Sequence, residues 1–109
     1  MVLIKIPTSR IVDWESFHDV FAEVFGFPTW YGRNMNAWID CLSDLDDPES
    51  TLCSTNAASG EVFVLHLEDG NEFSKRCPEQ YSAILECAAF VNGRRVECGE
   101  NAILLISCP

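Results

Sequence analysis

The sequence predicts an α/β domain built on a three-stranded parallel sheet packed with helices. Three short apolar runs, residues 2–6, 62–67 and 102–106, have the length and the branched side chains that are typical of strands. Segments with helical periodicity separate each run from the next, which gives the order β-α-α-β-α-α-β. Strands joined in this way pair in parallel through right-handed crossovers. Since the chain has 109 residues and no internal repeat, we expect residues 1–109 to form a single domain.

The segment after the first apolar run predicts an amphipathic helix that begins after Asp13, a favoured N-cap residue type. Apolar side chains then recur at steps of three and four along one face, at Trp14, Phe17, Phe21, Val24 and Phe25. Gly26 suits the left-handed conformation that commonly ends a helix. Pro28 prevents the helix from continuing.

A second helix is predicted from Asn34, which can cap it, to Leu42 or Ser43. One side of this helix is expected to face the core, because it gathers Ala37, Trp38, Cys41 and Leu42. Another stripe is expected to face solvent or a partner, and it contains Asn36, Asp40 and Ser43.

The remainder of the chain predicts a loop, two helices and two strands. Residues 43–60 are polar and indicate a loop. The run 62–67 is nearly all apolar, as expected for a strand whose two faces are both covered. A short helix is expected over Glu72–Arg76 and a longer one from Pro78, with Asn92-Gly93 as its end.

Charge is the most unusual feature of the composition, because 17 Asp and Glu against 7 Lys and Arg give a net charge of −10 at pH 7. Phosphate backbones repel such a surface, which argues against direct nucleic-acid binding. A basic protein would instead be attracted and steered toward it. The alternative is a surface charge that only keeps the protein soluble.

The cysteines and the N-terminal residues predict a cytoplasmic protein with reduced thiols. The six cysteines include no C-x-x-C pair, and with only two histidines a metal site has little support. The residues before Pro7 are too short an apolar stretch for a signal peptide, and no apolar run approaches the about 18 residues that span a membrane. Cys41 has no Cys–His arrangement around it, so we expect no catalytic residue and no enzyme.

A specific motif extends from Phe27 to Leu42, where an aromatic-Tyr-Gly segment follows a proline and leads into the second helix. The matching positions are Trp30, Tyr31, Gly32, Asn34, Ala37, Asp40, Cys41 and Leu42. In this motif, in the Phe17-His18 pair and in the predicted order of strands and helices, the chain resembles the barstar family over its whole length.

The resemblance implies an inhibitor of a microbial ribonuclease of the barnase type, or of a related toxin. In that family the second helix and the loop before it plug the enzyme's active site, where carboxylates occupy the places of substrate phosphates. It also implies an immunity protein of a toxin–antitoxin kind, which binds a basic ribonuclease or toxin one to one. Such a protein is expected to be a monomer when free and to use no cofactor.

By the same resemblance, we expect the partner-binding residues to be Trp30, Tyr31, Gly32, Asn34, Met35, Asn36, Ile39, Asp40 and Asp44. Asp40 is expected to be the central contact. A ribonuclease needs cations around the phosphate of its substrate, and a carboxylate on a rigid helix can take the place of that phosphate at little entropic cost. A negative patch is expected to extend from it through Asp44, Asp46, Asp47 and Glu49.

The other expected roles differ in kind. Trp30 and Tyr31 would add apolar contact area, with the alternative that each packs the loop against the body. Asn34 would cap the helix, and Gly32 would allow a backbone conformation that other residues avoid. Ile39 would supply apolar area at the rim of the interface.

Three features depart from the family's pattern. Asn36 stands where barstar carries a second contact acid, and Arg33 adds a basic residue beside the expected interface. Glu86 is the nearest candidate for a contact acid on the last helix. These departures leave an alternative open, in which the chain is an acidic interaction module that binds a basic protein other than a nuclease.

Overall fold

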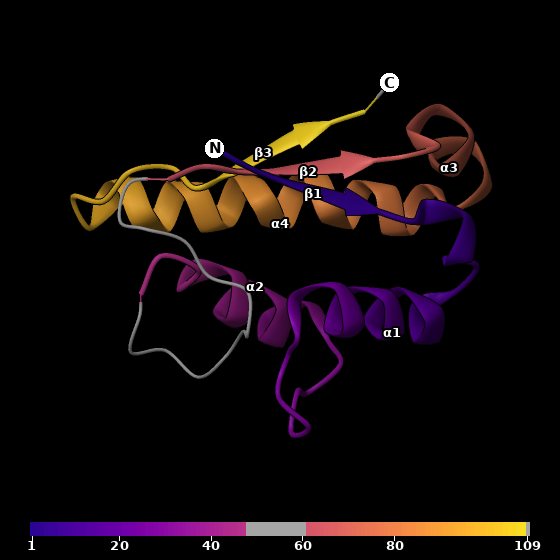
Figure 1. Cartoon of the computed structure of the whole chain (residues 1–109), viewed down its shortest axis with the longest axis horizontal. Coiled ribbons are helices and arrows are strands. Elements are labelled where there is room, and N and C mark those ends of the chain that lie inside the picture. The colour runs from indigo at the N-terminus through magenta and orange to yellow at the C-terminus, as the bar shows by residue number, and fades with distance from the viewer. Residues whose placement is uncertain (48–60, 109) are drawn as a thin grey trace.

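A computed structural model describes residues 1–47 and 61–108 and gives the element order expected from the sequence. The elements of these residues are drawn in Figure 1 and are β1 (Val2–Ile6), η1 (Thr8–Arg10), α1 (Trp14–Phe25), α2 (Met35–Ser43), β2 (Phe63–Leu67), α3 (Gly70–Arg76), α4 (Pro78–Glu97) and β3 (Leu104–Ser107). Apart from the single 3-10 turn η1, the order is β-α-α-β-α-α-β. The predicted fold class is therefore confirmed.

The strands form one parallel sheet in the order β1-β2-β3. Leu65 in the central strand pairs with Ile4 on one side and Ile106 on the other. The first strand has the predicted bounds, whereas the last begins at Leu104, two residues later than predicted. The intervening Ile103 is nevertheless buried, and its carbonyl accepts a hydrogen bond of 2.8 Å from the backbone N–H of Phe63.

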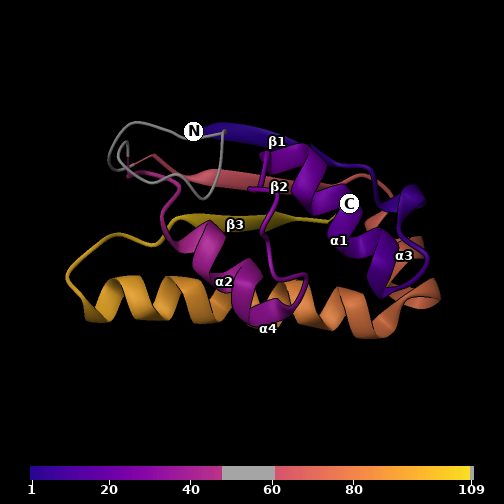
Figure 2. The same cartoon turned by 90° about the horizontal axis from the view of Figure 1, so that it is seen from below.

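Among residues 1–47 and 61–108, helices lie on one face of this sheet, and the central strand is buried on both faces, as the sequence predicts. Helices α1, α2 and α4 all lie on the same side (Figures 1 and 2). On the opposite face Leu3 and Leu105 are more than half exposed, while Val64 between them is buried. The central strand thus buries its apolar side chains on both faces, with a neighbouring strand on each side of it.

Local signals determine the bounds of α1 as the sequence predicts. The side chain of Asp13 accepts a hydrogen bond of 2.8 Å from the backbone N–H of Ser16, whose hydroxyl in turn accepts one from the backbone N–H of Asp13. Gly26 ends the helix with φ 66°, in the left-handed region. The apolar face of the helix packs into the core through the fully buried rings of Phe17, Phe21 and Phe25.

Helix α4 passes through Asn92-Gly93, where the sequence predicts its end, and continues to Glu97. The reason is that the side chain of Asn92 makes its hydrogen bonds with the backbone at the start of β3 and does not cap its own helix. Its Oδ1 accepts from the backbone N–H groups of Ile103 and Leu104, both at 3.0 Å, and its Nδ2 donates to the carbonyl of Leu104 at 2.8 Å. The additional turn of α4 carries two arginines that the sequence analysis did not single out, Arg94 and Arg95.

Arg95 is a buried cation that joins α4 to the end of α2. Its guanidinium donates to both carboxylate oxygens of Asp46, at 2.7 and 3.1 Å. It also donates to the carbonyl of Ser43 at 2.8 Å and, through Nε, to the carbonyl of Asn101 at 2.8 Å. With 5% of its side chain exposed, Arg95 exchanges water for a nearly complete set of acceptors and holds α2 against α4.

Replacing Arg95 with Met should lower the free energy of unfolding by about 3–5 kcal/mol, because the largely buried carboxylate of Asp46 would lose its partner. Urea denaturation at pH 7 measures this change. Arg94→Met is the matched control, since Arg94 is exposed and its replacement should change stability by less than about 1 kcal/mol. Equal losses in the two variants would show that Arg95 is not the tie between α2 and α4.

Candidate functional site

The loop between α1 and α2 and the exposed side of α2 form the surface that carries most of the predicted binding residues. The loop projects from the body of the protein (Figure 1). Asn34 caps α2, because its Oδ1 accepts a hydrogen bond of 2.8 Å from the backbone N–H of Ala37. This predicted cap is confirmed. The helix buries Trp38 and Leu42 completely and leaves Asp40 with 67% of its side chain exposed.

A hollow of about 320 Å³ lies beside this exposed carboxylate; we refer to it as the Trp30–Asp40 pocket. Its lining residues are Trp30, Tyr31, Gly32, Ala37, Asp40, Cys41, Ser43, Asp44 and Arg94. Five of the nine predicted binding residues meet here, although they are up to 14 positions apart in the sequence (30 to 44).

The two aromatic residues of the loop are placed differently. Trp30 is 67% exposed, so most of its ring is accessible to a partner. Tyr31 is 8% exposed, packs on Phe27 with ring centroids 4.6 Å apart, and shares a hydrogen bond of 2.7 Å with Nδ1 of His18. Burial raises the pKa of Tyr31, which keeps its hydroxyl protonated. Tyr31 thus holds the loop against α1, which is the second of the two roles expected for it.

The unusual backbone conformation of the loop lies at Arg33, not at Gly32 as the sequence analysis expected. Arg33 has φ 54°, a left-handed conformation that costs a side-chain-bearing residue energy. Its guanidinium donates to Asp19 at 2.8 Å and to the carbonyl of Glu15 at 2.9 Å, and these bonds to α1 offset the cost. A Cβ on Gly32 would lie 3.4 Å from Ala37 Cβ and from Asn34 Nδ2, which is ordinary van der Waals contact, so packing does not require a glycine here.

The acidic groups near the pocket fall into two sets. Asp40 and Asp44 line it, and the pKa of Asp44 is raised by partial burial and then by the nearby carboxylates of Asp47 and Glu100. Asp46 does not extend the negative patch as expected, because Arg95 neutralises it internally. Asp47 is exposed, and Glu49 lies outside the described residues.

Ile39 is buried, with 8% of its surface exposed, and belongs to the hydrophobic core. It cannot provide the apolar rim that the sequence analysis expected, because its position on α2 faces the interior along with Trp38 and Leu42. Asn36 is exposed and Met35 half-buried at the start of α2, so both are accessible at the tip of the helix.

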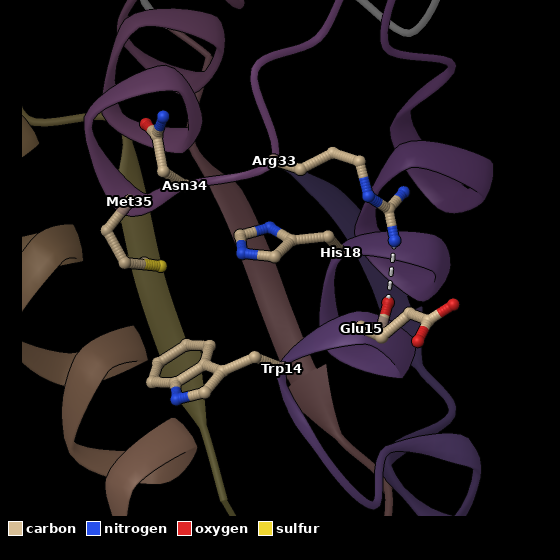
Figure 3. Close-up of a pocket in the computed structure, with 6 residues that line it drawn as sticks. All are labelled: Trp14, Glu15, His18, Arg33, Asn34 and Met35. Carbon is tan, nitrogen blue, oxygen red and sulfur yellow. Dashed lines mark hydrogen bonds between the residues drawn. The ribbon is translucent and has the colours of Figure 1, made fainter.

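Met35 also lines a second hollow of about 410 Å³, on the α1 side of the same tip. Figure 3 shows the rings of Trp14 and His18 and the thioether of Met35 around it, with Arg33 turned away toward Glu15. The helical periodicity predicts Trp14 on the core face of α1, but 37% of this residue is exposed because it lies in the first turn of the helix. Because Trp14 directly follows the N-cap residue Asp13, its position in the sequence already indicates partial exposure.

Carboxylates dominate the chemistry of the site. Burial, followed by the charges of Asp40 and Asp44, raises the pKa of the Cys41 thiol to about 11, which favours the protonated thiol at neutral pH. Within residues 1–47 and 61–108, no three His, Cys, Asp or Glu side chains gather as a metal site requires. In the same residues, no helix is long and apolar enough to cross a bilayer.

Sequence reasoning missed Arg94, which lines the Trp30–Asp40 pocket from α4. The predicted end of α4 at Asn92-Gly93 left this residue outside any element. Its Nη1 lies 3.9 Å from Oδ1 of Asp40. Glu86, the weak candidate for a contact acid on the last helix, is exposed on α4 but does not line this pocket.

The stability of the protein should fall more steeply below pH 6.5 in the wild type than in His18→Gln. Burial first, and the charge of Arg33 second, lower the pKa of His18 from its ordinary 6.5. The unfolded chain therefore binds this proton at a higher pH than the folded protein does. Stability that is present above the unfolded pKa is lost as pH falls from that value toward the lower pKa of the folded state. Urea midpoints between pH 5 and 7.5 measure the two slopes. Parallel slopes would mean that His18 does not titrate in this way.

The sequence that forms this loop, helix and sheet matches a known protein family. The family model described as Barstar (barnase inhibitor) matches residues 1–102, and the match thus includes both the Trp30–Asp40 pocket and Arg94. No protein in the curated set matches the chain.

Proposed function

The chain belongs to the barstar family, and from this membership we propose that it inhibits a basic ribonuclease, of the barnase type or a related toxin, by placing α2 and the preceding loop in the enzyme's active site. The observation that carries the proposal is the exposed carboxylate of Asp40 beside the exposed ring of Trp30, on a capped helix that is held against the rest of the protein.

The electrostatics of such an enzyme support this mode of binding. A ribonuclease holds the phosphate of its substrate and the charge that develops on it with cationic side chains. Asp40 offers a negative group of similar hydrogen-bonding capacity, and Asp44 offers a second one in the same pocket. Both belong to α2 or its C-cap, so little side-chain and backbone freedom would be lost on binding.

Trp30 would supply the apolar part of the contact. A large, rigid aromatic ring that is mostly exposed in the free protein buries much area when a partner covers it. Because the ring lines the same pocket as Asp40, it would also help to exclude water from the ion pair and so strengthen it. We propose one inhibitor per enzyme molecule, since the loop that leads into α2 projects from the body of the protein at one place (Figure 1).

A second candidate function is the binding of a basic protein that is not a nuclease. It is favoured by Asn36, which is exposed and uncharged at the tip of α2. A recognition surface with fewer acids fits a cleft with fewer cations. Tight binding to a basic protein, without inhibition of any ribonuclease, would favour this candidate over the first.

Asp40→Ala should weaken inhibition of barnase by about 2–5 kcal/mol, that is by about thirtyfold to several thousandfold, because a cation of the enzyme would be left buried without its partner. The inhibition constant measured against an RNA substrate tests this. Glu79→Ala is the matched control, since it removes one negative charge from an exposed position in the first turn of α4. If wild type and Asp40→Ala inhibit equally, the mechanism is wrong.

Affinity for the enzyme should decrease as pH falls through the raised pKa of Asp44. A partner's cation stabilises the ionised carboxylate, so binding expels the proton and becomes weaker where Asp44 is already protonated in the free protein. In Asp44→Asn the upper part of this pH dependence should be absent. Calorimetric titration between pH 4 and 7 compares the two proteins, and an unchanged profile in the variant would place Asp44 outside the interface.

A further inference from the structure

Arg94 introduces a positive charge into an otherwise acidic site. It is the one basic residue among the described residues that line the Trp30–Asp40 pocket. Its Nη1 is 3.9 Å from Oδ1 of Asp40, and the side chains are 53% and 67% exposed. Its guanidinium also lies over the ring of Phe90, 5.7 Å from the ring centroid.

Two other arginines near the site form hydrogen bonds with groups other than Asp40. Arg95 is buried and satisfied by Asp46 and by backbone carbonyls. Arg33 is held by Asp19 and by the carbonyl of Glu15. Arg94, in contrast, makes one long, exposed ion pair and a cation–π contact, and interactions of this kind contribute little and leave the side chain able to move.

We propose that Arg94 is a specificity residue, which pairs with Asp40 in the free protein and weakens binding to any ribonuclease whose cleft is uniformly basic. The inference rests on the proposed function and adds the chemistry of the partner. A cation that takes Asp40 must displace Arg94 or lie beside it, and both cost binding energy. A cleft that carries a carboxylate next to its cation escapes this cost, because the carboxylate can receive Arg94.

The device discriminates by repulsion rather than by an additional attraction. Proteins separate similar partners partly by placing like charges where the wrong partner would bind. At an interface, like charges brought together from which water is excluded cost more than the same charges in water. Phe90 offers Arg94 a place to lie when it leaves Asp40, so displacement without a carboxylate is costly but not prohibited.

The test compares Arg94→Gln and Arg94→Ala with wild type, using barnase as the basic probe and the dissociation constant as the readout. Arg10→Gln is the control, because Arg10 is also exposed and paired with one carboxylate, Glu23, but does not line the pocket. Both Arg94 variants should bind about fivefold tighter or more, and Arg10→Gln should bind nearly as wild type does. The gain should shrink as salt is raised toward about 0.5 M, because exposed charges are screened.

Each outcome decides the matter. Equal changes in Arg94→Gln and Arg10→Gln would reduce the effect to net charge and overturn the proposal, while leaving ribonuclease inhibition intact. A gain in Arg94→Ala without one in Arg94→Gln would assign it to side-chain size and also overturn the proposal. Binding by Arg94→Gln alone, with none by wild type, would support it strongly.

If no form binds barnase, inhibition of that enzyme is refuted, and the pairing of Arg94 is decided without a partner. The NMR resonance of the Arg94 Nε–H group should shift in Asp40→Asn and stay in place in Asp19→Asn, whose carboxylate pairs with Arg33 instead. An Arg94 resonance that responds equally to both substitutions would overturn the proposal.

Discussion

The buried guanidinium of Arg95 is the constraint on which the candidate site depends. It binds both oxygens of Asp46 and the carbonyl of Ser43. Arg95 thereby attaches the last turn of α2, and the residues just after that helix, to α4. With the Asn34 cap at the other end, both ends of a helix of nine residues are held. A helix this short is marginal alone, and these contacts make it a rigid support for Asp40.

This rigidity requires that one acid is withdrawn from the exposed surface of the candidate site. Asp46 is near Asp44 in the sequence, yet one belongs to the interior and the other to the pocket. The same turn of α4 presents Arg95 inward and Arg94 outward, because consecutive helical residues point about 100° apart. The turn of α4 that holds α2 through Arg95 therefore also places the cation of Arg94 beside Asp40. Helix geometry links these two contacts.

How much the sequence could predict depends on the range of the contacts. Asp13, Gly26 and Asn34 act within a few residues of themselves, and each has the predicted role. Asn92 and Arg95 act on residues about ten and about fifty positions away, so their residue types alone gave no signal, and the end of α4 was misplaced. Ile39 was misassigned for a related reason, since tertiary packing makes the buried side of α2 wider than the stripe that the sequence predicts.

A net charge of −10 attracts basic proteins in general and cannot by itself select one of them. Selection must come from charges close enough to be desolvated together with the partner, where one misplaced group outweighs many distant ones. In the described part of the chain, the pocket that carries Asp40, Asp44 and Arg94 brings opposite charges together at this range. An acidic surface with a local cation thus combines fast, unselective attraction with discrimination at contact, and this combination requires α2 and α4 to keep a fixed separation.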